Sequence, residues 1–273
     1  GLKALDLEAN SSNAHIPYFL ATEVYFPQKK WIKFNEMLDL ALEKNPTQNL
    51  EKPYLDNEGK LIKTIEEGSI RFKDDVWIKL FNESAGLLNN SFNDTTKKPQ
   101  IDPQLISNLE LCKSMDPNRK ESYELLIKIF AIANKKEQVL ITAYSGLKNI
   151  PCNEEFISSI IDFANDDISE MILLKTLLEK SVEDRICNDK NIEKHLLTVY
   201  LYTDNNSKAL ELGARLEDRF FDDAKLKRAI RICFEFREGN KLIYPTAMRR
   251  SLELVTGENV TNFKAQNARA IVE

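Results

Sequence analysis

The chain has 273 residues, of which 42% are hydrophobic and 30% are charged, with a formal net charge of −5. This composition excludes an intrinsically disordered protein, and the negative net charge argues against a general nucleic-acid-binding protein. No apolar run approaches the length of a membrane span. With only 8 glycines and 9 prolines, the sequence favours sustained helices over a sheet protein rich in turns.

Residues 15–46 carry two successive helical patterns. The first pattern places four residues at the i, i+3, i+4 and i+7 positions of one helix face: Tyr18, Ala21, Thr22 and Tyr25. The second places five residues on one face: Trp31, Phe34, Leu38, Ala41 and Leu42. Residues 27–30 separate the two helices, and Pro46 stops the second. Two short amphipathic helices cannot bury both apolar faces alone, so we expect neighbouring units of the same kind.

Residues 47–72 are compatible with two different structures. Turn residues at 57–59 and 67–69 flank the apolar segment LIKTI, which fits either an inserted β-hairpin or an irregular helix-turn. We favour a helix with a long loop. The stretch 74–88 then predicts an amphipathic helix with four inward side chains: Val76, Trp77, Leu80 and Phe81.

The polar stretch 91–103 is the predicted linker between an N-terminal helical part, residues 1–90, and a C-terminal helical part, residues 104–273. Asp102 followed by Pro103 is typical of a helix start, with a capping residue and a first-turn proline. Beyond it, helix follows helix with short breaks of cap or turn residues, at 116–117, 149–151, 165–167, 203–206 and 238–240.

The spacing within residues 15–46 resembles the tetratricopeptide repeat (TPR), a helix-turn-helix unit of about 34 residues. Counted from His15, the segment has aromatic residues at positions 4 and 11, a small residue at 8, alanine at 27 and proline at 32: Tyr18, Tyr25, Thr22, Ala41 and Pro46. Phe34 departs from the family, which usually has alanine at that position. Weaker versions of the pattern start at Lys120 and Lys190. The alternative is an irregular all-helical domain in which one segment matches the family by chance.

The resemblance implies an all-α, right-handed α-solenoid of TPR-like helix-turn-helix repeats, partly irregular, which binds partners along a concave groove. The groove positions of the family fall on eight residues: Ile16, Phe19, Glu23, Phe26, Lys194, Thr198, Leu201 and Tyr202. Phe19 and Glu23 replace the lysine and asparagine with which one subclass grips a C-terminal carboxylate, so we do not expect that clamp. An apolar and aromatic groove for a helix or an extended segment suits these residues better. Equally, Phe19 and Phe26 could pack against a neighbouring helix.

Catalytic and metal-binding motifs are absent from the sequence, including phosphate-binding glycine loops, H-E-x-x-H and G-x-S-x-G. His15 and His195 do not have the spacing of metal ligands. The cysteines form no C-x-x-C pair: Cys112, Cys152, Cys187 and Cys233. We therefore expect reduced thiols, a cytoplasmic protein, and neither a metal nor a cofactor. Residues 215–250 are locally basic, which we interpret as a solvated helix face rather than a nucleic-acid-binding patch.

The sequence therefore predicts a protein-interaction scaffold that binds a peptide or protein partner and has no catalysis of its own. Specific nucleic-acid binding and a membrane span are not expected, whereas the end faces of a solenoid leave self-association open. The alternative is the helical-repeat, substrate-positioning region of a larger enzyme, for example a glycosyltransferase, whose catalytic domain lies elsewhere. That alternative rests on analogy and on the start of the sequence within a repeat.

Overall fold

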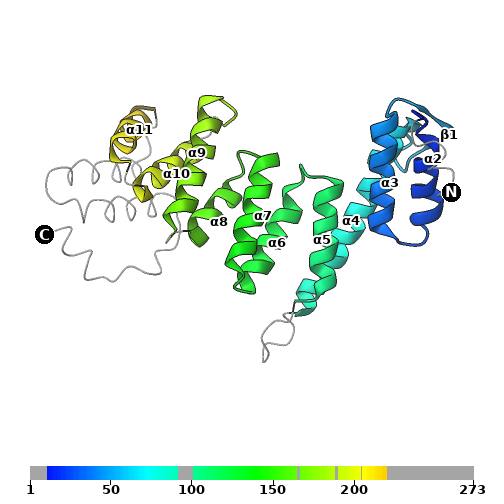
Figure 1. Cartoon of the computed structure of the whole chain (residues 1–273), viewed down its shortest axis with the longest axis horizontal. Helices are drawn as coiled ribbons and strands as arrows, with labels where there is room; N and C mark the ends of the chain where they lie inside the picture. Colours follow the sequence, from blue (N-terminus) through cyan, green and yellow to red (C-terminus); the bar gives the residue numbers. More distant parts are fainter. Residues whose placement is uncertain (1–10, 92–100, 165–166, 188–189, 204, 220–273) are drawn as a thin grey trace, which may run out of the picture. The chain divides into compact units, whose positions relative to one another are not determined.

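The computed structural model of the chain describes residues 11–91, 101–164, 167–187, 190–203 and 205–219. These residues are mostly helical, as predicted, with one small two-stranded sheet (Figure 1). The chain divides into two compact units, Gly1–Ile129 and Phe130–Glu273. Most of the predicted linker, most of the basic stretch 215–250, the two chain ends and Cys233 lie outside the described residues.

Unit 1 begins with the predicted pair of helices. They comprise α2 (His15–Phe19), its π-helical continuation η1 (Leu20–Tyr25), and α3 (Trp31–Lys44). Most of the predicted inward residues are buried, with Ala21, Phe34 and Leu38 fully inaccessible. Tyr18, Trp31 and Leu42 are partly buried. In η1 the amide of Phe26 donates to the carbonyl of Ala21, five residues back. The hydroxyl of Thr22 donates to the carbonyl of Tyr18 at 3.1 Å, a side-chain interaction that accompanies bent helices.

A β-hairpin follows, so the favoured helical interpretation of residues 47–72 is wrong and the hairpin alternative is confirmed. Strand β1 (Asn49–Leu55) pairs antiparallel with β2 (Leu61–Thr64). In the connecting turn, Oδ1 of Asp56 accepts hydrogen bonds from two backbone amides, both at 2.9 Å. The amide of Lys60 is the main cause that holds the pKa of Asp56 below its usual value. Leu50 and Ile62 point inward and pack in a buried cluster with Ile65.

Two long helices complete the core of unit 1. Helix α4 (Ile65–Ser91) begins directly after β2, and α5 (Pro103–Met115) packs against it. The predicted inward residues Val76, Trp77 and Leu80 are buried in the main core, which also contains Cys112. Asp102 caps α5 as predicted, because its side chain accepts from the amide of Gln104 at 2.8 Å and Pro103 occupies the first turn.

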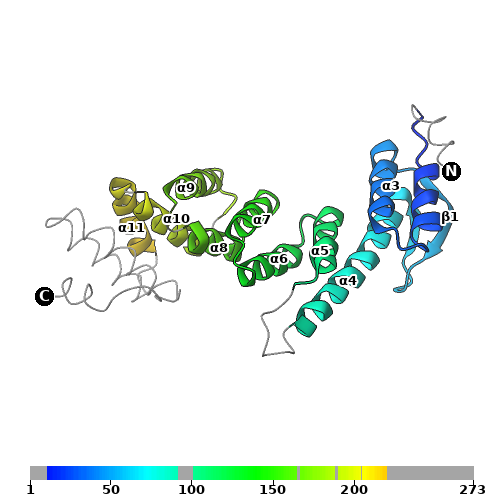
Figure 2. The same cartoon turned by 60° about the horizontal axis from the view of Figure 1, so that its bottom comes forward.

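Unit 2 is a succession of helices joined by short loops (Figures 1 and 2). Helix α6 (Lys120–Ile132) contains the boundary between the units. The helices that follow are α7 (Lys136–Asn149), α8 (Glu154–Ala164), α9 (Ile168–Glu183), α10 (Lys190–Tyr202) and α11 (Asn206–Arg219). Helix α8 packs against α7, α9 and α10. Short connections of this kind make consecutive helices antiparallel neighbours.

A disulfide bond joins Cys152, after α7, to Cys187, after α9, across a sequence separation of 35 residues. The expectation of reduced thiols is therefore wrong for these two cysteines. Cys112 is a free, buried cysteine, and burial raises the pKa of its thiol to about 12. Disulfides persist in oxidising compartments, so the Cys152–Cys187 bond argues against the predicted cytoplasmic location.

Candidate partner-binding groove

The structure brings three of the four predicted site residues of unit 1 together. Ile16, Phe19 and Glu23 line one cavity of about 710 Å³ between the first helix and strand β1. Phe19 is 58% exposed there. Phe26 points elsewhere: its ring lies 5.2 Å from the ring of Phe72 and packs against the main core. Phe26 is thus a packing residue, which was the alternative stated for it.

The hairpin changes the character of this unit 1 cavity. Strand β1 forms one wall, so Glu51 and Lys52 line the cavity together with Glu23 from the first helix. A Cβ on Gly68 would clash with the hydroxyl of Tyr18, so a larger residue at that position of α4 would force the tyrosine side chain to move. Burial, followed by the proximity of Tyr54, raises the pKa of Tyr18. The cavity is therefore a mixed polar and apolar opening, lined in part by strand β1.

The predicted site residues of unit 2 do not present an open surface. Lys194 and Thr198 are only 6% and 4% exposed within α10. The hydroxyl of Thr198 donates to the carbonyl of Lys194 at 3.1 Å, within the same helix. Tyr202 is half-buried, and the side chain of Leu201 lies outside what the structure describes.

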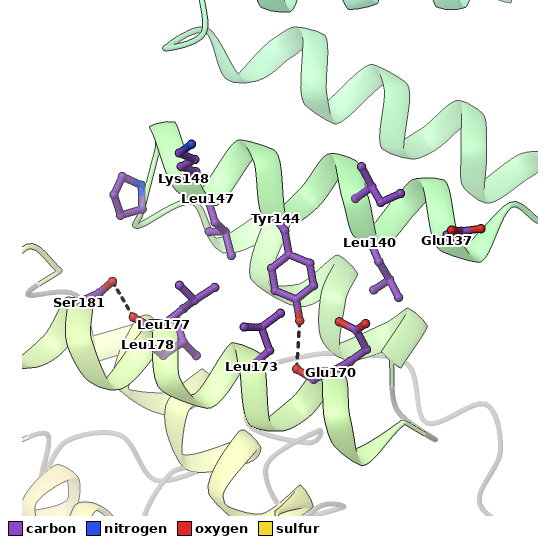
Figure 3. A pocket seen from close by; sticks show the side chains of 12 residues that line it. Glu137, Leu140, Tyr144, Leu147, Lys148, Glu170, Leu173, Leu177, Leu178 and Ser181 are labelled. Atoms are coloured by element: carbon purple, nitrogen blue, oxygen red, sulfur yellow. Dashed lines mark hydrogen bonds between the residues drawn. The ribbon is translucent and has the colours of Figure 1, made fainter.

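Unit 2 instead has a groove between α7 and α9, which we call the α7–α9 groove (Figure 3). Its volume is about 620 Å³. One face of each helix lines it, with residues recurring at helical spacing: Glu137, Leu140, Ile141, Tyr144, Leu147 and Lys148 from α7, and Glu170, Leu173, Leu177, Leu178 and Ser181 from α9. Pro151, in the loop after α7, also lines it.

The middle of the α7–α9 groove is apolar and preformed. Its floor is buried, since Leu140, Leu147 and Leu178 are at most 8% exposed. Its walls are open, with Ile141 at 60%, Leu173 at 48% and Leu177 at 39% exposure. The hydroxyl of Tyr144 donates to the backbone carbonyl of Glu170 at 3.0 Å and so ties one wall to the other. Burial raises the pKa of Tyr144, so its hydroxyl stays protonated and can act as the donor in this hydrogen bond.

Charged residues mark the two ends of the groove. Glu137 and Glu170 lie at the end where both helices begin, and Lys148 lies near the other end (Figure 3). No ion pair joins these three side chains to any other residue in the described part of the chain. The Oε2 atom of Glu170 is also buried without a hydrogen-bond donor among the described residues. The groove thus has an acidic end, an apolar middle and a basic end.

The repeat pattern does not indicate this groove, because the family places its binding positions on first helices, whereas α7 is the second helix of the weaker repeat that starts at Lys120 and α9 lies outside the three repeats. A signal was present in α9, whose apolar residues are too many for one helix face. Met171, Leu174 and Leu178 form the buried face, while Leu173 and Leu177 form a second, exposed one. A helix with two apolar faces needs two partners, and the described residues pack against the inner face of α9 while leaving Leu173 and Leu177 exposed.

The described residues were also compared with the requirements of a metal site and of a membrane span, and the sequence was compared with known proteins. Within the described ranges there is no group of three or more His, Cys, Asp or Glu side chains that could hold a metal ion. None of the helices described is both long and apolar enough to cross a membrane. No protein-family model matches the sequence, and no curated protein matches it. The resemblance to tetratricopeptide repeats therefore stands on the residues of the chain alone.

Proposed function

We propose that this chain is a protein-interaction scaffold, built as a partly irregular TPR-like solenoid, that binds a segment of a partner protein in the α7–α9 groove and catalyses no reaction itself. The observation that carries the proposal is the exposure of Ile141, Leu173 and Leu177 in one preformed groove. Contiguous apolar surface of this kind, flanked by polar residues, marks binding sites in soluble proteins.

The α7–α9 groove is a better binding site than the cavity of unit 1 for a physical reason. Its middle contains only aliphatic side chains and Tyr144, so a partner that covers it displaces water from apolar surface without stripping charges. Completing the burial of a partly exposed Leu or Ile contributes about 1 kcal/mol. Three such side chains give on the order of 3 kcal/mol, so a partner needs further contacts, which the charged ends can supply.

The test is selection of binding partners from a displayed library of natural protein fragments. The protein is compared with the double variant Ile141→Ala/Leu173→Ala and with the matched control Ile172→Ala. Ile172 is on the same helix and 46% exposed, but it does not line the groove. We expect selected fragments to lose at least about tenfold in affinity for the double variant, the loss typical of a truncated hot spot, and to keep it for the control.

Circular dichroism establishes that both variants fold. Fragments that bind all three proteins equally would contradict the proposed site. Fragments that no longer bind the Phe19→Ala variant, but still bind the groove variants, would move the site to the cavity of unit 1 and leave the scaffold function in place. Failure to select any fragment would contradict the function itself.

A further inference from the structure

We infer that the occupant of the α7–α9 groove is an amphipathic α-helix of a partner protein, antiparallel to α7 and α9, with acidic residues in its first turn and basic residues in its last turn. This inference rests on the proposed function, because it assumes that the groove is the binding site. It adds the secondary structure of the partner, its direction and the placement of its charges.

The lining of the groove selects a helix over an extended peptide. An extended segment needs partners for its own backbone amides and carbonyls, and burying them unpaired is costly. The middle of the groove offers no such partner, since its lining is aliphatic and the hydroxyl of Tyr144 is already bound to the carbonyl of Glu170. A helix pairs its backbone amides and carbonyls internally and presents only side chains, so it can cover the groove without burying unpaired backbone groups.

The dimensions of the groove set the length of this helix. The lining of α7 runs from Glu137 to Lys148, with Pro151 beyond. At about 1.5 Å per residue, this distance is about 16 Å, or three helical turns. A helix of three to four turns therefore reaches both charged ends, with apolar residues at i, i+3, i+4 and i+7 over Ile141, Leu173 and Leu177.

Two electrostatic contributions choose the direction. Basic residues are stabilised in the last turn of a helix and acidic residues in the first turn by the helix dipole. Basic residues of the bound helix would pair with Glu137 and Glu170 at the end where α7 and α9 begin. Acidic residues of the bound helix would pair with Lys148 at the other end. Both requirements hold together only if the incoming helix ends beside Glu137 and Glu170. Its dipole then also opposes the dipoles of α7 and α9, which is favourable.

The experiment uses two designed helical peptides of about 14 residues, both locked by lactam bridges so that their helicity is equal. They share one leucine stripe and one composition. The first peptide has Glu in its first turn and Lys in its last, and the second has the reverse. Binding to the full chain is measured by fluorescence anisotropy. We expect the first peptide to bind up to about fivefold more tightly, since the second peptide either meets three like charges or must lie parallel to α7 and α9, where the helix dipoles repel. Added salt should reduce this preference.

Charge variants of the groove make the test specific. The triple variant Glu137→Lys/Glu170→Lys/Lys148→Glu should reverse the preference between the peptides. If it does not fold, the milder Glu137→Gln/Lys148→Gln variant should reduce the preference while overall binding persists. Both are checked by circular dichroism.

The outcomes separate this inference from the proposed function. If both peptides bind equally and only the Ile141→Ala/Leu173→Ala variant loses this binding, the inferred direction of the bound helix is overturned and the scaffold function stands. No peptide binding, with extended library fragments selected through the groove instead, would overturn the helix. Dimerisation abolished by the same double variant would assign the groove to a second copy of the chain and overturn the inference. Absence of all groove-dependent binding would remove the proposed function as well.

Discussion

At the scale of single residues, Glu179 connects three helices of unit 2. Its carboxylate accepts hydrogen bonds from Tyr200 at 3.0 Å and from Lys208 at 2.6 Å, so α9 is linked to α10 and α11. Burial opposes ionisation of Glu179, but the hydrogen bonds from Lys208 and Tyr200 outweigh it and lower its pKa. Lys208 is about half exposed, so solvent screens this ion pair.

The Glu179→Gln substitution should lower the free energy of unfolding by about 1 kcal/mol at about pH 7, because it removes the charge from both hydrogen bonds. The folded pKa of Glu179 is depressed, so its contribution is present above the unfolded pKa, about 4.3, and is lost as the pH falls through the folded value. Urea unfolding followed by circular dichroism at about pH 7 and at about pH 2.5 should show the difference shrinking with acid.

The matched control for this pH dependence is Glu183→Gln, which removes an exposed carboxylate from the same helix. Its effect should be small at both pH values. A deficit in Glu179→Gln that stays constant down to low pH would show that the substitution acts through packing and not through charge.

At the scale of elements, helices α7 and α8 approach closely at one position. A Cβ on Gly146 would lie 2.6 Å from the ring of Phe156, which is fully buried. Glycine in a helix interior normally costs stability because of its backbone freedom. Here that cost is offset by the close packing of α8, which also supports the floor of the α7–α9 groove.

The Gly146→Ala substitution should therefore destabilise the protein by about 1–3 kcal/mol, the cost of overpacking a rigid core, although alanine is the better helix former. Gly86 in α4 is the control, since a Cβ there meets no atom within 4 Å. Gly86→Ala should stabilise by up to about 1 kcal/mol. Thermal unfolding of the two variants should shift in opposite directions, and a shift of both to higher temperature would contradict the packing argument.

Sequence periodicity correctly predicted those helices that bury a single apolar face against one core. The stripe of Phe34, Leu38 and Ala41 is buried as expected, and the capping pair at Asp102 starts α5 as expected. Residues 47–72 were assigned wrongly because LIKTI alternates only briefly, and strand pairing in β1 and β2 depends on partners distant in sequence.

The candidate site was harder to predict than the elements, since a groove is a property of two helices and not of one. Leu173 and Leu177 lie among other leucines, and nothing local distinguishes the exposed face of α9 from its buried face. The disulfide was not predicted because spacing alone does not bring Cys152 and Cys187 together; the packing of α8 and α9 does.

At the scale of the whole molecule, the two compact units carry different spectroscopic and chemical markers. Both tryptophans of the chain, Trp31 and Trp77, belong to unit 1. The Cys152–Cys187 disulfide belongs to unit 2. Tryptophan fluorescence therefore reports the unfolding of unit 1 alone, while reduction of the disulfide acts on unit 2.

Reduction of the disulfide should destabilise unit 2 by about 4 kcal/mol on the loop-closure model for a ring of this size, less if the reduced unfolded state keeps structure. Urea unfolding with and without a dithiol reductant should move the circular dichroism transition of unit 2 to lower urea. The tryptophan fluorescence transition of unit 1 should not move. Equal movement of both transitions would show that the two units unfold as one.

The π-helical segment η1 has a consequence for changes in chain length. Its turn holds one residue more than an α-helical turn, as the bond from Phe26 to Ala21 shows. Deleting one residue from Leu20–Tyr25, such as the exposed Glu23, should return the turn to α-helical geometry, because the amide of Phe26 and the carbonyl of Ala21 would then be four residues apart. The buried Ala14 and Pro17 should therefore keep their places in the core. A deletion in the regular helix α3 would instead rotate the residues on one side of it by about 100° and expose part of the buried face.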